Sequence, residues 1–311
     1  MLYLNESGNQ RCFVVGKQYE PETLSKLQSI QCMILKDFIK VCQENNLTYF
    51  GLAGTGIGVL RHGGFIPWDD DIDVGLLRKD YDKMIEIFKR DYSEKYTIVN
   101  GDEFKDYPLM TTRIMLNDTV FIEESLKNIK CPLGIFLDIY AFDNAAADEK
   151  LRRKQAFGAW FFSKLLILKH IPFPVLPFYG LKRKLAHCVT AAAWLALNVF
   201  CISHNWLYKK CKEISCKYND EDTKIYAFFC DTDKYSNYFE HDDLFPVRNE
   251  NFEGIQMSFP KNIEKSLTYM FGDYMTLPPV EKRKNHMPHM LDFGPYENFK
   301  EDDTDTTNQD V

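Results

Sequence analysis

The sequence lacks several features that would assign it to a familiar class. Its nine cysteines are an odd number without a regular pairing pattern, and no basic segment followed by an apolar run opens the chain. These absences predict reduced thiols in a cytoplasmic protein rather than a disulfide-rich secreted domain. Net basic charge is also missing, since the formal charge is −7. We therefore predict no nucleic-acid partner, because nucleic-acid binding needs a strongly basic face.

Apolar periodicity over most of the 311 residues predicts an α/β fold. Helical spacing runs through 21–46 and 78–92, and a turn with a helical segment is expected at 55–64. Short apolar or alternating runs predict strands at 47–54, 69–77, 109–116 and 134–143. The order of these elements implies a mixed sheet with flanking helices.

The segment 150–216 differs from the rest, being aromatic, aliphatic and edged with lysine and arginine. Residues 185–202 contain no Asp, Glu, Lys or Arg. Three interpretations stay open: a buried helical hairpin, an interfacial hairpin in contact with an anionic membrane surface, and a membrane span. We thus divide the chain into a catalytic core (20–149), a helical apolar and basic insertion (150–216), a part completing the catalytic domain (217–295) and an acidic disordered tail (300–311).

Four aspartates stand within five positions in "GFIPWDDDIDVGLL". On an extended strand Asp69, Asp71 and Asp73 would share one face, with aliphatic residues on the other. Like charges so placed repel one another, and oxygen-binding cations such as Mg²⁺, or Mn²⁺ as an alternative, would compensate. An EF-hand loop is excluded, because its sixth position would be Val74 instead of glycine and its twelfth Asp80 instead of glutamate. An exposed acidic turn and the D-x-D of a nucleotide-sugar glycosyltransferase are weaker alternatives.

The preceding "GLAGTGIG" follows an expected strand and includes Gly54 and Thr55. Small residues at such a position let backbone amides approach a phosphate. A strand, a Gly-Thr turn, a helix and a D-x-D strand together are the layout of a nucleotidyltransferase-type site for phosphoryl transfer.

Three blocks of the chain closely resemble the LicD family, the bacterial phosphocholine transferases related to fukutin. They are "GTGIGVLRHGGFIPWDDDIDVGLLRKDY", "GIFLDIYAFD" and "FEGIQMSFPKNIEKSLTYMFGDYMTLPPVEKRKNH", and the resemblance extends from about residue 25 to residue 292. It implies a nucleotidyltransferase-like fold and metal-binding roles for Asp71 and Asp73. The third carboxylate expected in this superfamily matches Asp138, with Asp143 as an alternative.

The resemblance also implies the reaction. A sugar hydroxyl of a surface glycan, possibly lipid-linked, would attack CDP-choline or another CDP-alcohol at the inner face of the membrane, where the protein would be peripheral. The expected catalytic and metal-binding residues are Asp69, Asp71, Asp73 and Asp138, and the expected substrate contacts are Gly54, Thr55, Arg61, His62, Trp68 and Arg113. Transfer of a nucleoside monophosphate to a sugar or protein is the alternative reaction. A non-enzymatic, membrane-associated assembly factor is the alternative class.

Overall fold

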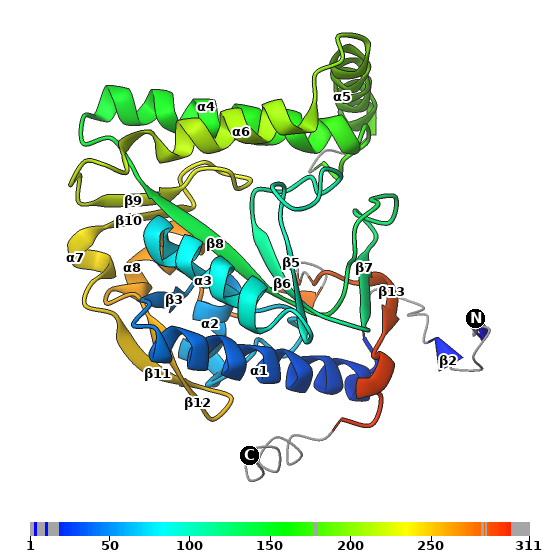
Figure 1. The fold of residues 1–311 in the computed structure, drawn as a ribbon, viewed down its shortest axis with the longest axis vertical. Helices are drawn as coiled ribbons and strands as arrows, with labels where there is room; N and C mark the ends of the chain where they lie inside the picture. The colour runs from blue at the N-terminus through cyan, green and yellow to red at the C-terminus, as the bar shows by residue number, and fades with distance from the viewer. Residues whose placement is uncertain are drawn as a thin grey trace.

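The computed structural model describes residues 3–4, 10–11, 19–176, 180–280, 283 and 285–299. Its centre is a seven-stranded sheet (Figure 1). The strands are β3 (Tyr49–Gly51), β4 (Asp73–Leu77), β5 (Tyr96–Val99), β6 (Thr112–Leu116), β8 (Phe136–Asn144), β9 (Ile225–Phe228) and β10 (Asn237–Glu240). The long strand β8 pairs in parallel with β4 and antiparallel with β6 and β9. The predicted α/β fold with a mixed sheet is confirmed.

Two amphipathic helices cover the sheet as their periodicity predicts. Helix α1 (Pro21–Glu44) begins with proline at its first position, which suits a helix start. Its buried face includes Leu27, Ile30 and Phe38, all without exposed surface. Helix α3 (Arg78–Asp91) follows β4 directly and buries Met84 and Phe88. These side chains join the apolar face of the sheet in one main core.

Helix α2 (Ala53–His62) connects β3 to β4 and packs against α8 (Ile263–Phe271). A Cβ at Gly56 would lie 2.9 Å from the terminal methyl of Ile263, so glycine lets the two helices approach closely without moving that side chain. In chain order, α7 (His241–Leu244) and the hairpin of β11 (Arg248–Phe252) and β12 (Ile255–Phe259) come between β10 and α8. The small elements are β1 (Tyr3–Leu4) paired with β2 (Gln10–Arg11), β7 (Val120–Glu123) paired with β13 (Pro288–Asp292), η1 (Cys216–Tyr218) and η3 (Gly294–Tyr296).

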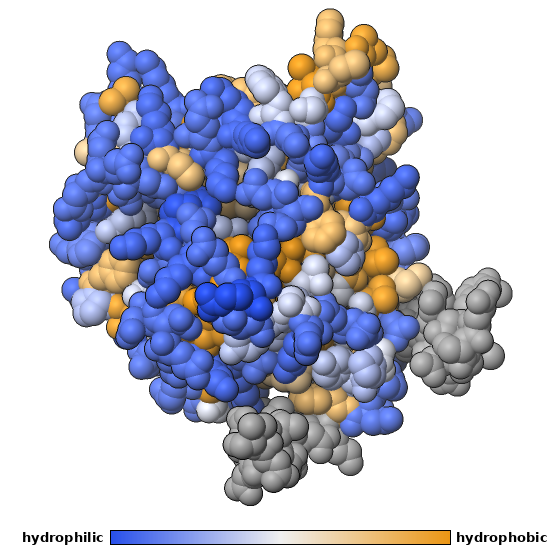
Figure 2. Space-filling view, in the orientation of Figure 1, coloured by the Kyte–Doolittle hydropathy of each residue, from blue (hydrophilic) through white to orange (hydrophobic). Residues whose placement is uncertain are grey.

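The segment expected to form a helical hairpin contains three helices: α4 (Glu149–His170), α5 (Gly180–Val199) and α6 (His204–Ser215). Helices α4 and α6 pack together, and Ala156 and Ala159 of α4 join a second core with Phe142 of β8. In α5 the buried set is Leu197 alone, so the buried-hairpin interpretation is wrong for this helix. Figure 2 shows hydrophobic residues gathered on α5, at the upper right. Its large exposed side chains are Leu181, Leu185, Val189, Trp194, Leu195 and Val199.

Among the described residues, no single helix is long and apolar enough to cross a membrane. Together, α5 and residues 204–218 reach the length and apolar content of a membrane span, but the two helical segments meet at a bend of 108°. The C-terminal strands β9 and β10 extend the same sheet as β8. The predicted acidic tail, 300–311, lies outside the described residues.

Candidate active site

Three neighbouring strands bring two acids and one base into a row across the sheet. The parallel register of β4 and β8 sets Asp73 opposite Asp138, and the antiparallel register of β6 and β8 sets Arg113 opposite Asp138. Paired positions direct their side chains to the same face of a sheet. All three residues are buried, with at most 7% of their surface exposed. The register of the sheet therefore creates a buried, charged centre from residues far apart in sequence.

Asp71 joins this centre from the segment before β4. Carboxylate oxygens of Asp71, Asp73 and Asp138 lie within 4.8 Å of one another. Asp143, the alternative third carboxylate, instead accepts two hydrogen bonds of 2.8 Å from Arg78. Three converging carboxylates are the donor set that hard divalent cations such as Mg²⁺ prefer, so these residues fit a metal. Metal binding itself stays a prediction.

The expected strand at 69–77 begins only at Asp73, so Asp69 and Asp71 do not share a strand face with it. The backbone carbonyls of Asp69 and Asp70 accept hydrogen bonds from the side chains of Gln28 and Gln31 on α1, at 2.9 and 2.7 Å, so they are not available to a neighbouring strand. Asp69 instead donates its backbone N–H to the carbonyl of Ile66 at 2.8 Å, which closes a turn. Among the described residues, Asp69 lies outside the group of three converging carboxylates. Its predicted role as a metal ligand has no support from this grouping.

The buried acids disfavour one another's ionised forms. Burial, together with repulsion from Asp71 and Asp138, holds the pKa of Asp73 well above its usual value. Burial also raises the pKa of Asp138 to about 6, although Arg113 opposes this. For Asp71, burial acts upward, but the charge and hydrogen bond of His286 outweigh it, and its pKa is lowered. A bound cation would relieve the repulsion that remains.

The guanidinium of Arg113 is shared between two carboxylates. Its Nε donates to Asp138 Oδ1 at 3.1 Å, and its Nη2 donates to Glu123 on β7. The group also lies over the ring of Phe136, 3.8 Å from the centroid. Among the described residues Nη1 has no hydrogen-bond partner. Arg113 therefore orients Asp138, and its predicted contact with substrate stays a prediction.

Asp70 and His286 form a hydrogen-bonded and charged contact with Asp71, next to the buried centre. Asp70 is fully buried and accepts hydrogen bonds from the hydroxyl of Tyr19 at 2.6 Å and the backbone N–H of His286 at 2.8 Å. Nδ1 of His286 lies 3.0 Å from Asp71 Oδ2, and the negative charge of Asp71 holds the pKa of His286 well above its usual value. His286 was not among the residues predicted for the site, and no local pattern marks it; the nearby His289 lies 3.1 Å from the exposed Glu124.

Gly54 and Thr55, at the start of α2, contact the acidic segment directly. Thr55 Oγ1 accepts the backbone N–H of Asp73 at 2.8 Å, which ties the start of α2 to the start of β4. A Cβ at Gly54 would lie 3.0 Å from Asp69 Oδ2, so a larger residue would press on that carboxylate. The first N–H groups of a helix have no partner within it, and they favour anions. The predicted phosphate contact at Gly54 and Thr55 stays a prediction that this placement suits.

Arg61 and His62 lie at the other end of α2, away from Thr55. Arg61 donates from Nη1 to the carbonyl of Tyr274 at 2.6 Å and from Nε to His62 at 2.9 Å. Trp68 carries the guanidinium of Arg283 over its ring at 4.2 Å. Among the described contacts, none joins Arg61, His62 or Trp68 to the central carboxylates, and their substrate roles stay predictions.

A cavity of about 220 Å³ adjoins the centre. Arg113, Asp138, Tyr140 and Lys164 line it together with the loop that follows β9. Lys164 comes from α4, and its Nζ donates to the carbonyls of residues 230 and 231. The 150–216 segment therefore contributes to the wall of the site.

The chain is similar to one protein-family model and to several known bacterial proteins. Residues 46–164 match the family model described as LicD/FKTN/FKRP, nucleotidyltransferase domain. Lipopolysaccharide cholinephosphotransferase LicD of Haemophilus influenzae is 27% identical over 278 residues, which are 85% of this chain and 96% of that protein. An uncharacterised protein of Rickettsia prowazekii is 34% identical over 65 residues, or 21% of this chain and 24% of that protein. One from Rickettsia typhi is 40% identical over 47 residues, or 15% of each. The three converging carboxylates all fall within the matched 46–164 segment, and His286 falls outside it.

Proposed function

The chain belongs to the LicD family, and we propose that it is a transferase that moves phosphocholine, or a related phospho-alcohol, from a CDP-linked donor to a sugar hydroxyl of a surface glycan. The observation that carries this proposal is the convergence of Asp71, Asp73 and Asp138 beside a cavity. The name of the Haemophilus influenzae relative supports phosphocholine as the transferred group and lipopolysaccharide as the kind of acceptor.

The proposed reaction is a displacement at phosphorus. The sugar oxygen forms a bond to the phosphorus that carries choline, the bond from that phosphorus to the bridging oxygen breaks, and CMP leaves. Attack at the other phosphorus would instead transfer the nucleotide. Catalysis of this type depends mainly on positioning and on neutralising charge.

Asp71 and Asp73 would hold the cations, and Asp138 would act toward the incoming hydroxyl as a ligand or as a base. When bound, Mg²⁺, or Mn²⁺ as the alternative, would neutralise charge on the phosphates. A base should have a pKa near the working pH. Without a cation the pKa of Asp138 is raised to about 6, and its carboxylate lines the cavity; the role of base would be favoured if Asp71 and Asp73 alone held the cations.

A lipid-linked acceptor would bring the enzyme to a membrane surface. Helix α5 carries exposed apolar side chains beside Lys182, Arg183 and Lys184. Apolar groups next to basic ones favour contact with an anionic lipid surface. We therefore propose peripheral contact through α5 at the inner face of the membrane.

Release of CMP from a panel of CDP-alcohols tests the donor class. Choline, ethanolamine, ribitol and glycerol forms would be compared with Mg²⁺ and with EDTA, in the presence of lipid-linked glycan. We expect turnover of at least one CDP-alcohol and its loss in EDTA. Changing residues that merely orient metal ligands typically costs ~10- to 100-fold, so Asp73→Asn should cost at least ~100-fold.

The exposed Asp106 provides a matched control, since Asp106→Asn makes the same chemical change at a residue that does not line the cavity at Asp138. This variant should retain wild-type turnover. Absence of turnover with every CDP-alcohol, accompanied by turnover of nucleoside triphosphates, would replace the proposal with nucleotidyl transfer.

A further inference from the structure

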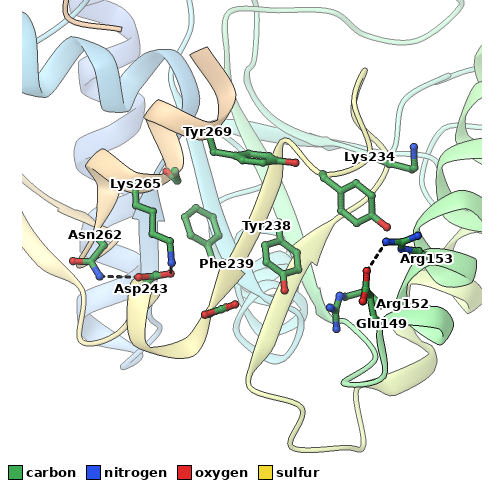
Figure 3. Close-up of a pocket in the computed structure, with 13 residues that line it drawn as sticks. Glu149, Arg152, Arg153, Lys234, Tyr238, Phe239, Asp243, Asn262, Lys265 and Tyr269 are labelled. Atoms are coloured by element: carbon green, nitrogen blue, oxygen red, sulfur yellow. Dashed lines mark hydrogen bonds and ion pairs between the residues drawn. The ribbon is translucent and has the colours of Figure 1, made fainter. Parts of the chain in front are cut away.

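A second and larger cavity lies at the edge of the sheet, between α4, β10 and α8. Its volume is about 660 Å³, which is within the range of small-molecule sites. Tyr235, Tyr238 and Tyr269 are its exposed or half-buried aromatic residues, and we call the cavity the tyrosine pocket. Figure 3 shows Tyr269 at the top of the pocket, with Phe239 and Tyr238 next to each other below it. Tyr269 has 67% of its surface exposed, which is high for an aromatic residue.

Some charged groups of the tyrosine pocket form ion pairs or hydrogen bonds with one another, and others could pair with a ligand. Asp243 accepts hydrogen bonds from Asn262 at 2.8 Å and from Lys265, and a second acid, at the start of α4, pairs with Arg153. Two further cations lie against aromatic rings: Arg152, 5.9 Å from the centroid of Tyr238, and Lys234, beside Tyr235. Neither of these two cations has an ion pair with a carboxylate among the described contacts. Arg152 does donate from Nη1 to two backbone carbonyls at 2.8 and 2.9 Å, whereas Lys234 has no described hydrogen bond. A third acid of the lining, Glu240, is likewise without an ion pair among the described contacts.

This combination fits a carbohydrate that carries an acidic group. A pyranose has a face of C–H groups, which suits a tyrosine ring, and an edge of hydroxyls, which suits planar amide, carboxylate and guanidinium groups. Arg152 and Lys234 would meet a phosphate or carboxylate substituent. An apolar ligand would cover the ammonium of Lys234 without giving it a polar partner.

The tyrosine pocket and the cavity at Asp138 are separate, but two segments of the chain line both of them. In the loop between β9 and β10, residues 230–232 line the cavity at Asp138, and residues 234 and 235 line the tyrosine pocket. Helix α4 likewise contributes Lys164 to the first cavity and Arg153 to the second, about 16 Å apart along the helix axis. A glycan whose reacting hydroxyl lies near Asp138 could therefore extend along this loop.

We infer that the tyrosine pocket binds the acceptor glycan, at acidic sugar residues beyond the one that is modified. The inference rests on the proposed function for the identity of the acceptor. It adds a second contact region, on the C-terminal half of the chain and the start of α4, that would select the glycan independently of the donor.

Saturation-transfer NMR without donor tests the inference directly. The probes are a deacylated lipopolysaccharide oligosaccharide, lactose as a neutral sugar, and CMP. Tyr269→Ala changes an exposed residue and should leave the fold intact, and Phe271→Ala is a matched control on the same helix outside the pocket. We expect the acidic oligosaccharide to bind the wild-type protein and the control, and to bind Tyr269→Ala about ten-fold more weakly. Lactose should bind more weakly than the acidic oligosaccharide.

Kinetics provide the second readout. Tyr269→Ala should raise KM for the glycan about ten-fold while changing kcat much less, because a distant sugar contact is made in both ground and transition states. Equal binding by Tyr269→Ala and Phe271→Ala, or displacement of the oligosaccharide by CMP, would overturn the inference. Binding lost in Tyr269→Ala but with no CDP-alcohol turnover would uphold the pocket and reject the donor assignment.

Discussion

Replacing Asp138 with asparagine should show how much the buried negative charge of this residue lowers the free energy of unfolding. The pKa of Asp138 rises from 3.8 to about 6 in the folded protein, chiefly because of burial. The folded state thus holds this proton more tightly than the unfolded chain, so its stabilisation is lost as pH rises through about 6. The difference in pKa corresponds to about 3 kcal/mol at pH 8, of which about 1.5 kcal/mol develops between pH 5 and pH 8.

Urea unfolding in EDTA at pH 5 and pH 8 measures this effect. Wild type should lose about 1.5 kcal/mol more stability over that interval than Asp138→Asn, because asparagine does not titrate. Asparagine keeps an oxygen that can accept from Nε of Arg113, now 3.1 Å from the carboxylate, so the fold should persist. Asp106→Asn should retain the wild-type pH dependence. Equal pH dependence in wild type and Asp138→Asn would refute the reasoning about buried charge.

Three further changes test the supports of the site and its surroundings. Thr55→Val removes the hydroxyl that accepts the buried N–H of Asp73 at 2.8 Å, so the free energy of unfolding in urea should fall by about 1–3 kcal/mol. Thr55→Ser keeps the hydroxyl and should retain most of the stability. Equal losses in the two variants would argue against this hydrogen bond. Gly58→Ala would put a Cβ 2.3 Å from a backbone carbonyl and should lower the free energy of unfolding by about 1–3 kcal/mol; an unchanged value would mean that the loop yields freely. The side chains of Leu185 and Val189 on α5 are 59% and 69% exposed, so the double variant Leu185→Glu with Val189→Glu should no longer co-sediment with anionic vesicles. Undiminished binding would mean that α5 is not the part of the protein that contacts the membrane.

Much of the fold follows from local pattern. The helical spacing of apolar residues predicts α1 and α3, and the alternation around Val74 and Ile139 predicts β4 and β8 because each strand must bury one face. The segment at 69–72 departs from this rule. There the carbonyls of Asp69 and Asp70 accept hydrogen bonds from side chains of α1, and the N–H of Asp69 closes a turn, so these residues do not continue the strand.

Parts of the site depend on contacts that local pattern does not encode. Glu123 reaches Arg113 from β7, and His286 reaches Asp71 from the segment before β13. These two strands pair with each other across more than 160 residues of sequence. The tyrosine pocket is likewise assembled from separate elements, so its tyrosines have no common motif.

Mass spectrometry of the modified glycan tests the central claim most directly. The enzyme would be incubated with CDP-choline, Mg²⁺ and a lipopolysaccharide acceptor, with Asp73→Asn in parallel. We predict that the glycan gains the mass of one phosphocholine group, that CMP appears in equal amount, and that neither occurs with Asp73→Asn. A glycan that gains the mass of a nucleoside monophosphate, or that stays unmodified while Asp73→Asn behaves as wild type, would contradict the account.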